Sequence, residues 1–183
     1  MNKELWETLS SEIIFSDPWI RLRRDFVKQP GVKPRPYSVI ELKGGVGVVA
    51  INEQAQILIV GQYRHPVKRY SWEIPKGGFT DFVQANRTPL LTAKRELKEE
   101  TGYVATQWDS LAVVNTLLGS TNDEVFLYCA RNLTAGPTQF EEVEDLIDRW
   151  VNVDEFWEMV SKHDITDATS IAAVGICLRY GYL

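Results

Sequence analysis

The stretch that decides the fold is residues 88–102, TPLLTAKRELKEETG. Thr88 is a residue type that caps helix N-termini, Pro89 suits the first helical position, and Gly102 suits the left-handed backbone at a helix end. The spacing between them predicts a helix of about three and a half turns. One apolar stripe along this helix is expected to face the core: Leu90, Ala93 and Leu97.

Three carboxylates gather at the edge of that stripe. Glu96 and Glu100 lie one turn apart, and Glu99 sits just beyond them. Like charges at this spacing repel by about 0.2–0.5 kcal/mol per exposed pair, and by more when buried. A divalent cation would relieve the repulsion, and Mg²⁺ or Mn²⁺ takes oxygen ligands of this kind. The alternative is a solvated acidic face, which an Arg95–Glu99 pair at i,i+4 would support.

Residues 72–78, WEIPKGG, precede this helix and read as the end of a strand followed by a loop. Pro75 ends the strand, and the two glycines allow the backbone to approach a ligand closely. A strand, a glycine-rich loop and an acid-bearing helix together predict a cradle for a metal ion and a diphosphate.

These segments resemble the signature of the Nudix hydrolases, which is Gly, five residues, Glu, seven residues, then Arg-Glu-aliphatic-x-Glu-Glu-x-Gly-aliphatic. Residues 95–103, RELKEETGY, match the second half at every fixed polar and glycine position. Tyr103 replaces the closing aliphatic residue, which is a mild variation.

The first half of the signature departs from the family pattern. Arg87 stands where the early Glu belongs, and Gly77 lies four residues further from Arg95 than the pattern allows. The loop 79–87 is therefore expected to be lengthened, which loops tolerate. Asp81, within this loop, is a candidate substitute for the missing acid.

The resemblance implies an α+β fold, an α/β/α sandwich with a mixed sheet and an N-terminal β-strand extension. Residues 1–43 are expected to form that extension and residues 44–183 the Nudix hydrolase domain. The activity implied is Mg²⁺- or Mn²⁺-dependent hydrolysis of the pyrophosphate bond of ADP-ribose or a related nucleoside diphosphate sugar. The alternative is a non-catalytic Nudix-fold module that binds a nucleotide or a protein, which Arg87 and the lengthened loop motivate.

The resemblance also implies roles for single residues. The metal ligands are expected to be Glu96, Glu99, Glu100 and the backbone carbonyl of Lys76. The catalytic set is expected to be Arg95, Glu99, Glu100 and Glu124. In this set Arg95 pairs with a signature Glu, and Glu124 closes a Gly-x-x-x-x-Glu loop that in the family helps to activate water. The alternative for Glu124 is an ordinary loop carboxylate.

The expected substrate-binding residues are Trp19, Arg21, Arg64 and Glu73. Arg64 ends a Gln-Tyr-Arg strand and can grip a phosphate through two parallel hydrogen bonds, or it is a plain surface residue. Arg21 opens a segment with six of the 20 basic residues, which either hold a polyphosphate or form a solvated strand face. Glu73 either faces the substrate or is a surface acid, and Trp19 is one candidate to stack on the base.

Alternating and apolar runs predict the remaining elements. Strands are expected at 12–15, 19–27, 37–42, 44–51, 56–63, 105–115, 125–130 and 149–153, and helices at 154–160 and 167–180. Residues 44–51 begin GGVG, but a turn follows them, so a core strand paired with 56–63 as a hairpin is favoured over a dinucleotide site. Four side chains of the last helix are expected to turn inward: Ile171, Val174, Cys177 and Leu178.

Composition sets broad limits on the class of protein. A length of 183 residues suits one domain, alone or with an added N-terminal element, and a net charge of −5 argues against a nucleic-acid binder. Cys129 and Cys177 sit in apolar runs, which favours core thiols. No signal peptide or membrane-spanning run is seen, so a cytoplasmic protein without membrane partners is expected. A homodimer is implied by the resemblance alone. One acidic run is expected to be solvated: Glu141, Glu142, Glu144, Asp145 and Asp148.

Overall fold

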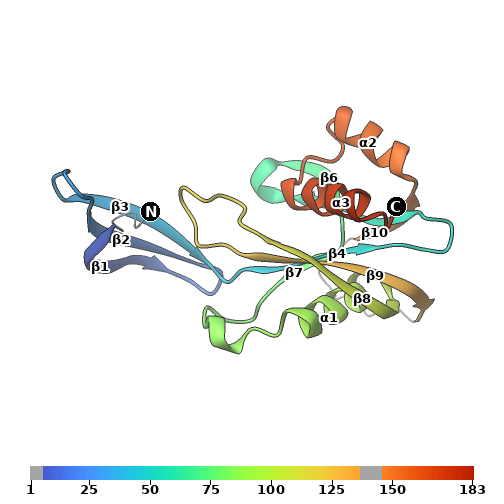
Figure 1. Cartoon of the computed structure of the whole chain (residues 1–183), viewed down its shortest axis with the longest axis horizontal. Coiled ribbons are helices and arrows are strands. Elements are labelled where there is room, and N and C mark those ends of the chain that lie inside the picture. Colours follow the sequence, from blue (N-terminus) through green and yellow to red (C-terminus); the bar gives the residue numbers. More distant parts are fainter. Residues whose placement is uncertain (1–5, 137–145) are drawn as a thin grey trace.

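The computed structural model describes residues 6–136 and 146–183, and it has a mixed sheet between helices (Figure 1). The sheet has the strand order β7-β4-β9-β8, with β4 parallel to β9 and the other pairs antiparallel. Its strands are β4 (Gly45–Ala50), β7 (Lys76–Gly78), β8 (Tyr103–Val114) and β9 (Val125–Ala135). Helix α1 (Pro89–Thr101) covers one face and α3 (Ala168–Tyr180) the other. The expected α/β/α sandwich with a mixed sheet is confirmed.

A second sheet packs beside the first and has the order β10-β5-β6. Its strands are β5 (Ile57–Arg64), β6 (Arg69–Glu73) and β10 (Ile147–Val151), and α2 (Val153–Ser161) follows β10. The predicted hairpin between 44–51 and 56–63 is wrong, because β4 and β5 lie in different sheets. Only the bridge between Ile51 and Ile57 joins them, and beyond it the two strands diverge. Two short 3₁₀ turns complete the chain, η1 (His65–Val67) and η2 (Gln84–Asn86).

Strand β4 is buried on both faces, which explains its unbroken apolar sequence. Val46 and Val48 belong to the cluster under α1, which includes Ala93 and Leu97 of that helix. Val49 belongs to the larger cluster on the opposite face, with side chains from α2 and α3. The first of these clusters fixes α1 against the central sheet, and the glutamates of α1 therefore project from a rigid element.

Helix α1 begins and ends where the sequence predicts. Gly102 has φ of 72° and its amide donates to the carbonyl of Lys98, which ends the helix. Thr88 occupies the N-cap position, but its side chain makes no capping hydrogen bond, so that part of the prediction is wrong. Leu90 also differs from the prediction: it lies in the first turn and is 37% exposed, whereas Ala93 and Leu97 are fully buried.

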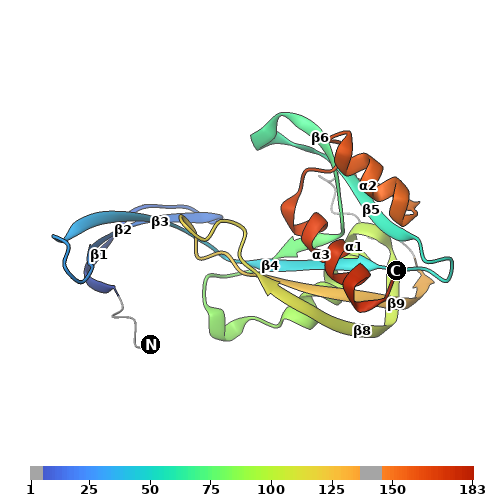
Figure 2. The ribbon, with the colours of Figure 1, turned by 45° about the horizontal axis from the view of Figure 1, so that its top comes forward.

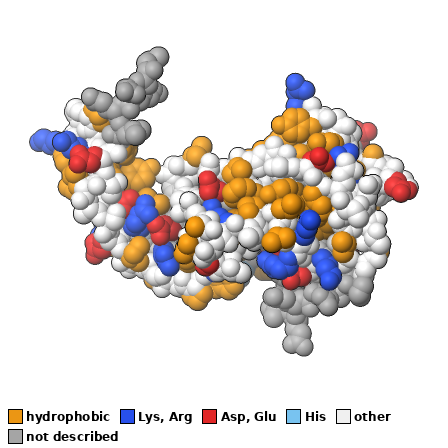
Figure 3. Space-filling view, turned by 60° about the horizontal axis from the view of Figure 1, so that its bottom comes forward, with side chains coloured by type: hydrophobic (Ala, Val, Ile, Leu, Met, Phe, Trp, Pro, Cys, Tyr) orange, Lys and Arg blue, Asp and Glu red, His pale blue; other side chains and the backbone are white. Residues whose placement is uncertain are grey.

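The N-terminal strands form a separate sheet that projects from the sandwich (Figures 1 and 2). It has the order β1 (Glu7–Ser16), β2 (Ile20–Lys28) and β3 (Arg35–Leu42), with antiparallel pairing throughout. Every residue of β1 is exposed, including several large apolar side chains: Leu9, Ile13, Ile14 and Phe15. Figure 3 shows hydrophobic side chains on the surface of this projecting part.

Strand β3 joins this sheet to the loop 117–122. The amide of Ile40 donates to the carbonyl of Ser120 at 2.8 Å, and the hydroxyl of Tyr37 donates to the carbonyl of Gly119 at 2.7 Å. The amide of Leu42 donates to the side-chain oxygen of Asn122 at 2.9 Å. The N-terminal sheet therefore fixes the segment that leads to Glu124.

The two cysteines, helix α3 and the acidic run were also predicted from the sequence. Cys129 and Cys177 are buried free thiols, as predicted. In α3, Val174 and Cys177 are fully buried, while Ile171 and Leu178 are partly exposed. Asp148 is exposed, and the rest of the acidic run lies outside the described residues: Glu141, Glu142, Glu144 and Asp145. Among the described residues, no helix has the length and apolar character needed to cross a membrane.

Candidate active site

A cavity of about 390 Å³ lies between α1, β5 and β7, with the β1–β2 turn at its edge. Ten residues line it: Trp19, Gln62, Arg64, Lys76, Gly77, Gly78, Arg95, Glu96, Glu99 and Glu100. The fold thus brings together all the residues that were expected to hold a metal. Two of the four expected substrate-binding residues, Trp19 and Arg64, line the same cavity.

The glycine-rich strand β7 lies directly against the carboxylates of α1. A Cβ atom added at Gly77 would lie 1.9 Å from the carboxyl carbon of Glu96, so only glycine leaves room for that side chain. The amide of Lys76 donates to Glu100 Oε2 at 3.0 Å, and Glu100 is 5% exposed. Both carboxylates are therefore held at the backbone of β7.

Arg95 lies among the glutamates of its own helix. Its guanidinium contacts the carboxylates of Glu96 and Glu99. Burial alone would lower the pKa of Arg95, but the two neighbouring carboxylates outweigh burial and raise it. Arg95 thereby offsets part of the repulsion among the glutamates. In the described part of the chain, the acidic side chains do not converge on a single metal-sized point in this conformation.

A network of ion pairs centred on the buried Glu73 lies beside the cavity. Arg64 makes two parallel hydrogen bonds to Glu73, at 2.6 and 2.8 Å, and Glu73 is 2% exposed. Lys76 Nζ lies 2.5 Å from Glu73 and 2.8 Å from Asp167. Glu73 therefore lies under the cavity, where it orients Arg64 and Lys76, and it does not line the cavity wall.

Asp167 joins this network from the N-terminus of α3. It caps that helix by accepting from the amide of Ser170 at 2.9 Å. Burial would raise the pKa of Asp167, but Lys76 and the hydrogen bonds from Ser170 outweigh burial and hold the pKa below its ordinary value. Asp167 therefore stays ionised and neutralises Lys76. Sequence reasoning missed it because its partner is 91 residues away in the chain.

Glu124 lies outside the cavity and pairs with Arg87, the residue that replaces the early Glu of the signature. Arg87 Nη1 lies 2.7 Å from Glu124 Oε2, and Arg87 Nη2 donates to the carbonyl of Lys43 at 2.7 Å. The side chain of Arg87 is only 5% exposed. Arg87 thus links the lengthened loop to the starts of both β4 and β9.

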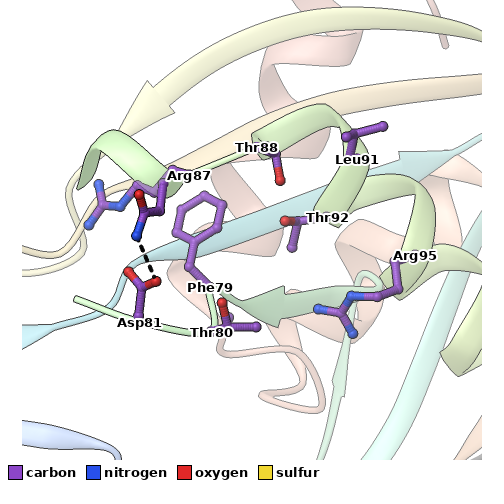
Figure 4. A pocket seen from close by; sticks show the side chains of 10 residues that line it. Phe79, Thr80, Asp81, Arg87, Thr88, Leu91, Thr92 and Arg95 are labelled. Atoms are coloured by element: carbon purple, nitrogen blue, oxygen red, sulfur yellow. Dashed lines mark hydrogen bonds between the residues drawn. The ribbon is translucent and has the colours of Figure 1, made fainter. Parts of the chain in front are cut away.

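The lengthened loop borders a second, smaller cavity of about 220 Å³ beside α1 (Figure 4). In Figure 4 the side chains of Arg87 and Arg95 lie at opposite ends of this cavity. Asp81 accepts hydrogen bonds from the amide of Val83 at 2.7 Å and from Asn86 at 3.1 Å, which close the loop on itself. The structure therefore places Asp81 away from the glutamates of the first cavity.

Arg21, also expected to bind substrate, does not line the first cavity. Its guanidinium lies 4.2 Å from the centre of the Phe82 ring in the lengthened loop. Lys43 Nζ lies 5.4 Å from the Trp19 ring and 5.7 Å from the Phe82 ring. Sequence reasoning missed Lys43 and Phe82, since nothing in a single sequence shows that this loop folds back toward β2.

Comparisons with known proteins identify the family of the chain. The NUDIX domain family matches residues 41–174, and the nucleoside diphosphate sugar hydrolase N-terminal domain matches residues 6–40. An ADP-ribose pyrophosphatase from Mycobacterium tuberculosis is 35% identical over 171 residues, which cover 92% of this chain and 81% of that protein. A methanol dehydrogenase activator from Bacillus methanolicus is 31% identical over 172 residues, which cover 92% of this chain and 90% of that protein.

A solved structure described as an ADP compounds hydrolase shares the fold, with a TM-score of 0.84. It is 16% identical in sequence, and the alignment covers 98% of this chain and 96% of that one. The family match spans most of the chain and includes the glycine-rich strand, the glutamate-bearing helix and the cavity between them. The chain therefore belongs to the Nudix hydrolase family.

Proposed function

We propose that this protein hydrolyses the diphosphate linkage of ADP-ribose or a related nucleoside diphosphate sugar, using a divalent metal ion. The observation that carries the proposal is the cavity lined by Glu96, Glu99 and Glu100, in which Glu96 and Glu100 lie against the backbone of β7. The similarity to a relative named ADP-ribose pyrophosphatase supports the substrate class. In the proposed reaction the oxygen of a water molecule bonds to one phosphorus, and the bridging P–O bond breaks. The products are a nucleoside monophosphate and a sugar phosphate.

The donor set of the cavity fits Mg²⁺ or Mn²⁺, because both prefer carboxylate and carbonyl oxygens. Glu96, Glu99, Glu100 and the backbone carbonyl of Lys76 are the proposed ligands. The space at Gly77 supports this assignment, since it lets Glu96 lie against β7. When bound, such an ion lowers the pKa of water and neutralises diphosphate charge.

The other predicted residues take supporting roles in the proposal. Arg95 orients Glu96 and Glu99, and Glu73 orients Arg64 toward the substrate phosphates. Glu124 is retained as the proposed group that activates water, which requires it to leave Arg87 and turn toward the bound substrate.

Trp19 and Arg21 belong to the substrate side of the site in this proposal. Trp19 is 75% exposed and lines the cavity, so its ring is available to stack on a nucleobase. Arg21 lies on the adjacent strand β2 and adds positive charge near the same entrance.

We further propose that the protein is a homodimer formed through its N-terminal sheet. The exposed strand β1 supports this, because it presents large apolar side chains that a second copy would cover. Sedimentation velocity tests the dimer: Phe15→Glu is expected to shift the protein to monomer, whereas an unchanged dimer would refute this interface. The cytoplasmic location stays a prediction.

The substrate class is tested by a hydrolysis screen with Mg²⁺ over nucleoside diphosphate sugars, dinucleotides and nucleoside triphosphates. Chromatography of the products is expected to show monophosphate and sugar phosphate from one class. Nucleotide binding without turnover under Mg²⁺ and Mn²⁺ would instead favour the non-catalytic binding module. The ion pair of Arg87 and Glu124 is the observation that favours this second function, because it engages Glu124, the proposed water-activating group, with the arginine that replaces the early Glu of the signature.

A further inference from the structure

We propose that Lys43 binds a phosphate group of the substrate and that Phe82 is the positioning residue that holds Lys43 at the entrance of the cavity. This inference rests on the proposed function and extends it to the lengthened loop, residues 79–87. It gives a role in substrate binding to this loop, where the chain departs from the family signature.

Contacts with two aromatic rings place Lys43 beside the cavity. Its ammonium group lies 5.4 Å from the Trp19 ring and 5.7 Å from the Phe82 ring, both within the range of cation–π attraction. Trp19 also lines the cavity that contains Glu96, Glu99 and Glu100. The ring of Trp19 therefore joins Lys43 to the wall of the proposed active site.

The basic residues inside the cavity already have carboxylate partners. Arg64 is paired with Glu73, Lys76 with Glu73 and Asp167, and Arg95 with two glutamates of α1. Two basic residues at the entrance differ. Within residues 6–136 and 146–183, no carboxylate lies within 4.0 Å of the side-chain nitrogens of Lys43 or Arg21.

This difference in charge pairing favours the entrance as a site for phosphate. Lys43 is half-buried, and a cation over an aromatic ring is held more weakly than one that is hydrogen-bonded to an anion. A substrate phosphate can therefore take Lys43 from the rings without breaking a salt bridge. Arg21 also contacts the Phe82 ring, at 4.2 Å, and adds a second positive charge near Lys43.

The lengthened loop contacts Lys43 through two residues. Arg87 donates to the carbonyl of Lys43 at 2.7 Å, and Phe82 lies under its ammonium group. The loop is itself fixed at both ends, since Phe79 is 7% exposed and the Arg87 side chain 5% exposed. The hydrogen bond from the side chain of Asn86 to Asp81 (Figure 4) and the one from the amide of Val83 to Asp81 close its middle. An arginine at position 87 thus does what the family's glutamate could not, because only a donor can bind that carbonyl.

The experiment compares Lys43→Met, Phe82→Ala and Phe82→Tyr with a control, Lys28→Met. Lys28 is an exposed lysine, whereas Lys43 is half-buried, and Lys28 lies at the end of β2 with no part in the cavity. With ADP-ribose and Mg²⁺, Lys43→Met is expected to raise KM by about tenfold, the effect of losing one charged hydrogen bond, with the loss falling on KM and not on kcat. Phe82→Ala is expected to shift KM in the same direction, Phe82→Tyr to restore it, and all variants to keep the wild-type melting temperature.

Direct binding separates a failure of this inference from a failure of the proposed activity. Isothermal titration calorimetry in EDTA, where turnover is blocked, uses ADP-ribose and adenosine as the two probes. Lys43→Met is expected to weaken ADP-ribose binding and leave adenosine binding unchanged, because adenosine lacks phosphate. Equal weakening for both probes, equal effects of Lys43→Met and Lys28→Met, or no binding of ADP-ribose to the wild type would overturn the inference. Binding that follows the expected pattern without turnover would refute the proposed activity alone.

Discussion

Replacing Gly77 with alanine tests whether the position of Glu96 matters for catalysis. The added Cβ would lie 1.9 Å from the carboxyl carbon of Glu96. Since two carbon atoms in contact normally lie about 3.5 Å apart, that carboxylate must move by about 1.6 Å. A displacement of about 1 Å in a catalytic group commonly lowers the rate by about a hundredfold. We therefore expect Gly77→Ala to reduce kcat/KM for ADP-ribose by about a hundredfold.

The same substitution should cost little stability, because the displaced atoms are the end of a flexible side chain. A strained side-chain rotamer costs about 0.5–1.5 kcal/mol, so the melting temperature should fall by no more than about 5 °C. Calorimetric titration with Mn²⁺ should show weaker metal binding in this variant.

Gly78→Ala supplies the matched control, since its added Cβ would lie 3.7 Å from the carbonyl oxygen of Gly44, which is an ordinary van der Waals contact. This variant should retain activity and metal affinity close to the wild type. If Gly77→Ala and Gly78→Ala have the same kcat/KM, the position of Glu96 against β7 is not needed for turnover and the reasoning fails.

Three further changes probe the site and the fold. Glu100→Gln should lower kcat more than about a hundredfold, which exceeds the usual effect of replacing a residue that only supports a metal ligand. Its melting temperature should stay near normal, because Gln still accepts the hydrogen bond from the Lys76 amide. Near-normal turnover would contradict the assignment of Glu100 as a ligand. Asp167 has a lowered pKa when folded, so its stabilisation is complete above its ordinary value of 3.8 and is lost as the pH falls through the folded value. Asp167→Asn keeps a good N-cap but no charge, so its melting temperature should fall less steeply than the wild type's below pH 3.8, and equal slopes would contradict the ion pair. Phe156→Ala, at a fully buried position on α2, should cost about 3–5 kcal/mol in urea unfolding, and a loss below about 1 kcal/mol would show that α2 does not pack as described.

Local sequence signals were sufficient for helix α1 and for most strands, but not for β7 (Lys76–Gly78), which the glycine-rich sequence predicted as a loop. Proline and glycine at its ends set the limits of α1, and unbroken apolar runs marked buried strands such as β4. The pairing of β5 was predicted wrongly, because a short turn between two apolar strands favours a hairpin locally. In the folded chain β5 pairs with β6 and β10 instead, and β10 lies far away in the sequence.

The site was predictable where its residues share one helix or one motif, and not where distant segments meet. The spacing of Glu96, Glu99 and Glu100 placed them along one edge of α1. The contacts of Lys76 with Asp167 and of Phe82 with Arg21 join segments that no periodic pattern links. Such contacts depend on how the sheets pack, so they require the three-dimensional structure.

The most direct test of the central claim is a ³¹P NMR time course with ADP-ribose and Mg²⁺. The two diphosphate signals should be replaced by two monophosphate signals of equal intensity, and addition of EDTA should stop the conversion. Diphosphate signals that persist unchanged with Mg²⁺ and with Mn²⁺ would contradict the proposed hydrolysis.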